Sequence, residues 1–147
     1  MTLLVVGVGN PDRGDDAVGW EVASAVRDVA RVRLSHGEPA GLVEAWQSHR
    51  GPAVMVDATV SGRPPGTVTV IDARATHLDP SWVASSHGMG PVEAIELARA
   101  LGALPESLTF VGVEARCFDP GTEPGPDVRV GADRAISLIR SWAGRGT

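Results

Sequence analysis

Short apolar runs alternate along the chain with longer amphipathic segments. The apolar runs, most of them rich in valine and isoleucine, have the length of buried strands and fall at residues 3–8, 31–34, 53–57, 67–71 and 108–113. Between them, apolar residues recur at helical spacing over residues 17–30, 42–47, 91–101 and 128–142. Strands that alternate with helices predict an α/β fold, in which a mainly parallel sheet is covered by helices on both faces.

The rest of the chain is expected to form loops. Residues 76–86 show no regular period, and residues 117–126 are rich in glycine and proline. No internal repeat or linker interrupts the pattern, and 147 residues are enough to bury a proper core. We therefore expect a single domain over residues 1–147.

Composition narrows the classes of partner. The chain has 13 basic residues, all of them arginine, against 18 acidic residues, and its net charge is −5. The arginines are scattered, so no basic stripe for nucleic acid is present. Neither a signal peptide nor a run of about 18 apolar residues occurs, which argues against a membrane protein. The single cysteine, Cys117, excludes an internal disulfide and fits the reducing cytoplasm, where we place the protein.

The first strand ends in an unusual loop. Gly7-Val8-Gly9 is followed by the turn signal Asn10-Pro11 and then by two adjacent acids, Asp15 and Asp16. This is the mouth of a strand–loop–helix unit, where open α/β sheets bind ligands. A dinucleotide site is disfavoured because Asp12 stands where the third glycine should be, and the acids would repel a pyrophosphate. The chain has no lysine and hence no Walker loop.

The sequence offers residues for two other kinds of catalytic site, a serine hydrolase site and a divalent metal site. Ser85-Ser86-His87 lacks the Gly-x-Ser-x-Gly elbow of serine hydrolases, and adjacency of Ser and His carries little weight. A divalent metal site is more plausible, because Asp16 and Asp57 follow strands whose carboxyl ends converge, and His87 lies in a later Gly-rich loop. Spacing alone leaves open that Asp16 caps a helix, Asp57 binds backbone N–H groups and His87 is an ordinary loop residue.

Several blocks in a fixed order carry a resemblance. They are Gly7-Val8-Gly9-Asn10, Asp15-Asp16, Val56-Asp57-Ala58, Ser86-His87-Gly88-Met89-Gly90 and Phe110-Val111-Gly112-Val113. In this order the chain resembles the hydrogenase maturation protease family, endopeptidases that remove the C-terminal extension from the large subunit of nickel–iron hydrogenases. The resemblance covers nearly the whole chain.

The resemblance implies a fold, a site and a partner. The fold is a three-layer sandwich of the phosphorylase/hydrolase-like type, with a twisted, mainly parallel sheet. Asp16, Asp57 and His87 match the acids and the histidine that contact the nickel already installed in the large-subunit precursor. The nickel then belongs to the substrate, and the protease, expected to be a monomer, needs no permanent cofactor.

One block departs from the family pattern. Many relatives carry Asp-Gly-Gly-Thr after the second strand, where this chain has His36-Gly37-Glu38-Pro39, followed by Gly41. Gly37, Glu38 and Gly41 are therefore our candidates for substrate contact. Glu38 could take over the role of the missing acid, or it could be a solvated loop residue.

The chemistry expected of the site is peptide hydrolysis. No Ser, Cys or Thr stands in a credible nucleophile context, so Asp16 and Asp57 are the catalytic candidates. Either a carboxylate acts as general base or the substrate's metal activates water. Asp15 is expected to cap the following helix as a neighbour of the site.

Alternatives and minor candidates complete the picture. A binding module of the same fold could recognise the precursor without cutting it. A nucleotide hydrolase is disfavoured because no Gly-rich helix start for a phosphate is present. Arg63 and Arg116 are candidates for steering a peptide carboxylate, and Trp82 is expected to pack at the core or rim beside the His87 loop.

Overall fold

The computed structural model describes residues 2–83 and 90–145. Within this part of the chain the strands form one five-stranded sheet in the order β2-β1-β3-β5-β4. Its strands are β1 (Leu4–Val8), β2 (Arg31–Ser35), β3 (Pro52–Thr59), β4 (Val68–Asp72) and β5 (Ser107–Glu114). The α-helices are α1 (Val18–Ser24), α2 (Pro39–Gln47), α3 (Pro91–Leu101) and α4 (Pro126–Arg145), and the short 3₁₀ helices are η1 (Gly14–Ala17) and η2 (Pro80–Trp82).

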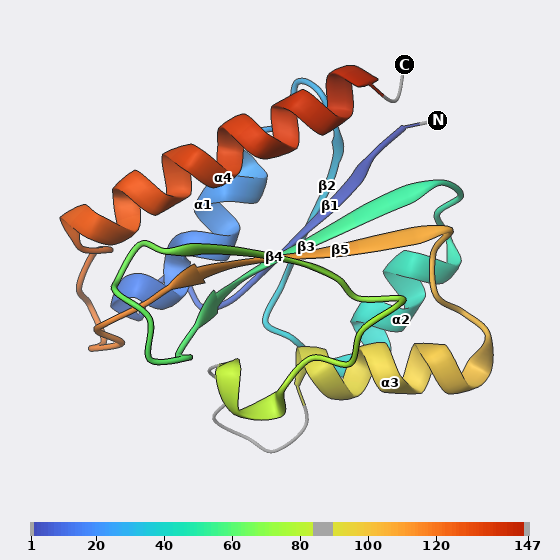
Figure 1. Ribbon diagram of the computed structural model, residues 1–147, viewed down its shortest axis with the longest axis horizontal. Coiled ribbons are helices and arrows are strands. Elements are labelled where there is room, and N and C mark those ends of the chain that lie inside the picture. The colour runs from blue at the N-terminus through green and yellow to red at the C-terminus, as the bar shows by residue number, and fades with distance from the viewer. Residues whose placement is uncertain (1, 84–89, 146–147) are drawn as a thin grey trace.

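The winding of the chain reverses between β1 and β3. β1 pairs in parallel with β2 on one side and with β3 on the other, and β3 pairs in parallel with β5. Successive crossovers in opposite directions place α1 on one face of the sheet and α2 on the other. Figure 1 shows α1 and α4 above the sheet and α2 and α3 below it. The predicted α/β sandwich with a mainly parallel sheet is thus confirmed.

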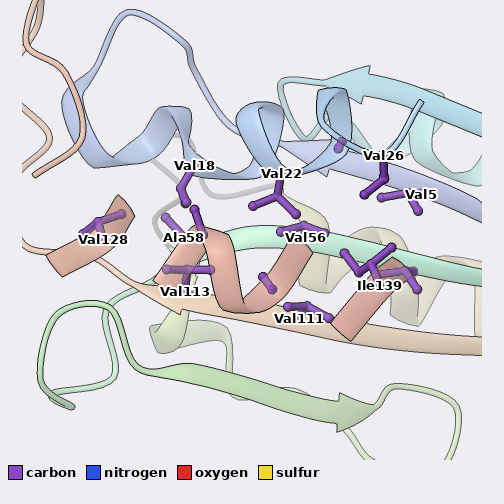
Figure 2. Packing of buried hydrophobic residues seen from close by; sticks show 14 of the residues in the cluster. Val5, Val18, Val22, Val26, Val56, Ala58, Val111, Val113, Val128 and Ile139 are labelled. Atoms are coloured by element: carbon purple, nitrogen blue, oxygen red, sulfur yellow. The ribbon is translucent and has the colours of Figure 1, made fainter. Parts of the chain in front are cut away.

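Two apolar layers fill the space between sheet and helices. On the α1/α4 face, valines of the strands pack against both helices (Figure 2); the labelled members are Val5, Val18, Val22, Val26, Val56, Ala58, Val111, Val113, Val128 and Ile139. The α2/α3 face is covered by larger side chains, among them Leu4, Val6, Leu42, Trp46, Met55, Ile95 and Phe110. Because side chains alternate along a strand, Asp57 follows Met55 onto the α2/α3 face.

Several elements differ from the sequence prediction. The helix expected over residues 17–30 starts as the 3₁₀ helix η1 and ends at Ser24, after which Val26 still packs into the core from a non-helical turn. Side-chain periodicity therefore overstates the length of this helix. β4 pairs with β5 in antiparallel orientation at the sheet edge. Part of the region expected to be irregular forms η2, and no helix among the described residues could cross a membrane.

Gly7 in β1 and Gly9 directly after it allow the close packing of the chain at this end of the strand. A Cβ at Gly7 would overlap the Gly19 carbonyl of α1 and lie 2.8 Å from the Ala23 Cβ. A Cβ at Gly9 would overlap the carbonyl of Asp16, where the loop returns. The two glycines let α1 approach β1 closely and bring the acidic loop back over the end of the strand.

We expect Gly7→Ala to lower the free energy of unfolding by about 1–3 kcal/mol, because the added methyl group overpacks the contact between β1 and α1. The change is measured by urea denaturation. Gly144→Ala is the matched control, since no atom lies within 4 Å of a Cβ there and alanine favours a helix. Equal stability of the Gly7→Ala variant and the wild type would contradict this account of the packing.

Candidate functional site

The loop after β1 presents Asp16 at the carboxyl end of the sheet. The loop is closed by backbone hydrogen bonds, from Asn10 N to Asp16 O (3.2 Å) and from Asp16 N to Arg13 O (3.1 Å). Asp16 is 8% exposed, and its Oδ1 is buried without a hydrogen-bond partner among the described residues. A buried carboxylate oxygen in this condition is costly, and it marks a position where a ligand could bind.

Asp57 lies beside it at the switch point between β1 and β3. It is 1% exposed, and its Oδ1 accepts a hydrogen bond from its neighbour Ala58 N at 2.8 Å. In the sheet register Asp57 pairs with Gly112, so the residue of β5 directly opposite it contributes no side chain. The structure thus places Asp57 where an open α/β sheet binds ligands, and its role in the site stays a prediction.

The two carboxyl groups interact electrostatically. Burial, reinforced by the negative charge of Asp16, raises the pKa of Asp57 well above its usual range. Burial also raises the pKa of Asp16, although the positive charge of Arg13 and the backbone N–H of Asn10 act in the opposite direction. The structure therefore brings together the two acids that the sequence analysis selected.

His87, the third predicted member of the site, lies outside the described residues. The described residues on either side of its segment are fixed near the same edge. Val83 forms a β-bridge with Thr59, and Val60 N donates to Trp82 O. Gly90 N donates to Glu93 Oε1 at the start of α3. Over residues 2–83 and 90–145, no group of three His, Cys, Asp or Glu side chains could hold a metal ion.

The candidate substrate-contact residues line the neighbouring corner between β2 and α2. Gly37 is buried, adopts a left-handed φ of 101° and would place a Cβ 3.3 Å from both Pro91 and Val8. Glu38 is exposed at the N-terminus of α2, and Gly41 lies in its first turn. Glu38, Gly41 and His36 help to line a pocket of about 130 Å³.

Asp15 has a different role from the one expected. It makes no capping hydrogen bond to η1 or α1. Its carboxylate, 2% exposed, instead accepts hydrogen bonds from Arg116 N (2.7 Å), Cys117 N (2.9 Å) and Gly125 N (2.8 Å). The prediction of a helix cap is wrong, because the loop between β5 and α4 supplies three backbone donors that the helix terminus does not.

Sequence reasoning missed a second buried carboxylate of this kind. Glu114, at the end of β5, accepts hydrogen bonds from Thr59 Oγ1, Ser61 N, Ser61 Oγ and Gly62 N. It is in phase with Phe110 and Gly112 on the α2/α3 face of β5, whose two faces are both buried near its end. Its place directly after the apolar run 108–113 is the signal that could have identified it. Glu114 fastens the loop between β3 and β4 to the sheet.

The four buried acids thus fall into two pairs with different chemistry. Asp15 and Glu114 are saturated by donors of the chain itself and are structural. Asp16 and Asp57 accept few hydrogen bonds from the described residues, carry like charges when ionised and have raised pKa values. A pair of this type can exchange protons with a substrate or bind a cation that the substrate brings.

Comparisons with known proteins show the family of the chain. The family model described as hydrogenase maturation protease matches residues 40–142. The chain is 27% identical to the hydrogenase 2 maturation protease of Escherichia coli K12 over 95% of this chain and 88% of that protein.

Solved structures show the same fold. The hydrogenase maturating endopeptidase HybD from E. coli superposes with a TM-score of 0.81 at 23% identity, covering 99% of this chain and 94% of that one. A [NiFe] hydrogenase maturation protease HycI from Thermococcus kodakarensis KOD1 gives a TM-score of 0.71 at 26% identity, over 95% of this chain and 90% of that one.

We expect Asp57→Asn to stabilise the fold at pH 8, by an amount on the order of 1 kcal/mol. Because the pKa of Asp57 is raised in the folded chain, stability falls as pH rises from the ordinary aspartate pKa through the folded-state value. The neutral amide removes this loss, so the difference between variant and wild type should grow between about pH 4 and pH 8. Urea denaturation across this range measures it, and a variant less stable than wild type at pH 8 would contradict the assignment.

We expect Asp15→Asn to have the opposite effect. An amide replaces one acceptor oxygen by an NH₂ group that faces a backbone N–H, which costs about 1–3 kcal/mol of stability. The same denaturation experiment at pH 8 compares it with Asp57→Asn, which removes the same charge. Equal stability of the Asp15→Asn variant and wild type would show that the loop between β5 and α4 does not depend on this carboxylate.

Proposed function

The chain belongs to the hydrogenase maturation protease family, and we propose that two acids at the carboxyl end of its sheet, Asp16 and Asp57, form the catalytic centre. In this proposal the centre processes a nickel-loaded hydrogenase large-subunit precursor. The protein is a hydrogenase maturation endopeptidase, which cleaves the C-terminus of that subunit. The binding-only alternative is thereby disfavoured. What the proposal adds is the identity of the residues and the form of the substrate they act on.

The observation that carries the proposal is the unpartnered, buried Oδ1 of Asp16 beside the buried carboxyl group of Asp57. A cation that arrives with the substrate would relieve the mutual repulsion of the two groups. Carboxylate and imidazole are suitable ligands for a borderline divalent metal, so we propose that Asp16, Asp57 and His87 contact the nickel of the precursor. The nickel acts as a signal that the precursor is ready, and no resident cofactor is needed.

The same pair is suited to proton transfer. A carboxylate that contacts the nickel through one oxygen keeps its second oxygen free. That oxygen can accept the proton of the attacking water and then return it to the leaving amine as the peptide bond breaks. In this proposal the chain supplies acid and base, and the bound nickel centre positions the scissile peptide.

Substrate contact outside the pair is assigned to Gly37, Glu38 and Gly41. Gly37 connects β2 to α2 beside Val8 and Pro91, so its backbone lies close to the end of β1. Glu38 and Gly41 line the adjoining pocket. We propose that the polypeptide on one side of the cleavage position lies along this corner. We also propose that the protein acts in the cytoplasm, where Cys117 stays reduced.

We expect Asp16→Asn, Asp57→Asn and His87→Ala each to reduce processing of the purified nickel-loaded precursor at least 100-fold, the usual contribution of a catalytic acid or base. The mass of the large subunit, measured over time, reports loss of the C-terminal extension. A nickel-free precursor should remain uncut by the wild type.

Asp133→Asn is the matched control, because it makes the same chemical change at an exposed position of α4. It should process the precursor at the wild-type rate. Wild-type cleavage rates in both Asp16→Asn and Asp57→Asn would refute the assignment of the acid pair. Cleavage of nickel-free precursor at the wild-type rate would refute the role of the metal.

A further inference from the structure

We propose that Arg63 forms a binding site for a carboxylate of the substrate at the catalytic edge of the sheet. The inference rests on the proposed function, since it assigns a further contact to the same substrate. Arg63 lies in the loop between β3 and β4, six residues after Asp57 in the sequence. Figure 1 shows this loop and η2 at the same end of the sheet as the tips of β3 and β5.

The loop that carries Arg63 is unusually well fixed. Glu114, 3% exposed, binds its first half through Thr59 Oγ1 (2.8 Å), Ser61 Oγ (2.7 Å) and the backbone N–H groups of Ser61 (2.9 Å) and Gly62 (3.1 Å). Hydrogen bonds to a buried carboxylate are among the stronger ones in proteins. The loop is therefore positioned before any substrate arrives.

The side chain of Arg63 is held by the same network. Its Nη1 donates to Ser61 Oγ at 3.0 Å, so it is linked through that hydroxyl to Glu114. Its guanidinium carbon lies 4.7 Å from the ring centroid of Trp82, within the range of a cation–π contact. Trp82 is fixed in turn, because its carbonyl accepts a hydrogen bond from Val60 N.

The charge of Arg63 is nevertheless not neutralised. Within residues 2–83 and 90–145, the ion pairs that include arginine engage Arg99, Arg129 and Arg140, and none includes Arg63. An exposed guanidinium that is ordered on an aromatic ring keeps most of its donors available. Such a group is prepared to bind a carboxylate with little further loss of side-chain entropy.

The electrostatics of the edge give this group a task. The chain has a net charge of −5, and Asp16 and Asp57 would repel any carboxylate on the peptide being cut. A fixed cation on the adjoining loop offsets that repulsion and sets the register of the peptide. The carboxylate could belong to an acidic side chain of the extension or to its C-terminus, and the chemistry of recognition is the same for both.

The test compares Arg63→Gln with wild type in cleavage of the nickel-loaded precursor. We expect KM to rise about tenfold while kcat changes less than twofold, because a lost charge-assisted hydrogen bond weakens binding. Arg63→Lys, which keeps the charge, should recover part of the loss, and added salt should narrow the difference between Arg63→Gln and wild type. Arg50→Gln is the matched control, an exposed arginine just before the amino end of β3, and should leave KM unchanged.

Two substrate arms identify the carboxylate. One precursor has the acidic side chains of its extension replaced by amides, and the other has an amidated C-terminus. The precursor that lacks the recognised carboxylate should have a raised KM with wild type and no further rise with Arg63→Gln. If Arg63→Gln raises KM equally for all precursors, Arg63 recognises no carboxylate of the extension and the proposal is wrong.

Glu114→Gln tests whether the hydrogen bonds of Glu114 to the loop between β3 and β4 position Arg63. If Glu114 acts by positioning Arg63, the KM effects of Glu114→Gln and Arg63→Gln should not add in the double variant. An unchanged KM for Arg63→Gln, or a fall in kcat and thermal stability alone, would show a purely structural role and overturn the proposal. Failure of the wild type to cut the precursor would instead refute the proposed function, and the Kd of the precursor for wild type and Arg63→Gln would still decide the role of Arg63.

Discussion

The candidate site depends on one constraint, which is the burial of two neighbouring carboxyl groups of like charge. Asp16 and Asp57 meet because the winding of the sheet reverses between β1 and β3, which brings the loop after β1 over the end of β3. Each group loses hydration on burial, which raises its pKa, and the charge of Asp16 raises the pKa of Asp57 further. The fold must hold them together by interactions elsewhere, since neither is stabilised by a set of donors of its own.

The other two buried acids show how the fold achieves this. Asp15 is the neighbour of Asp16 in η1. Its carboxylate, unlike that of Asp16, accepts hydrogen bonds from three backbone N–H groups of the segment between β5 and α4. Glu114 binds the segment after β3 in a similar way. These two saturated carboxylates fix the loops on either side of the unsaturated pair. All four acids are buried, so burial does not distinguish them. The number of hydrogen bonds that each carboxylate accepts separates the structural acids from those available for chemistry.

Part of this arrangement could be predicted from the sequence, and the reasons for success and failure are physical. Apolar runs indicated the strands. The acids in the loop after the first run and at the end of the third run indicated Asp16 and Asp57, because the carboxyl ends of parallel strands converge. The role of Asp15 could not be predicted, since its donors lie about a hundred residues away along the chain. The early end of α1 was also hidden, because the apolar period continues into a turn whose Val26 still faces the core.

An acid pair kept short of partners is best understood as an incomplete site. In the proposed function the missing component is the nickel that the precursor carries, so the pair would be stabilised only when a correctly loaded substrate is bound. A site saturated by its own chain, like that of Asp15, would gain nothing from such a cation and could not distinguish loaded from empty precursor. In this proposal, discrimination depends on a free enzyme in which the chain itself leaves the acid pair short of partners. The pKa of Asp57, raised by burial and further by the charge of Asp16, agrees with such a site.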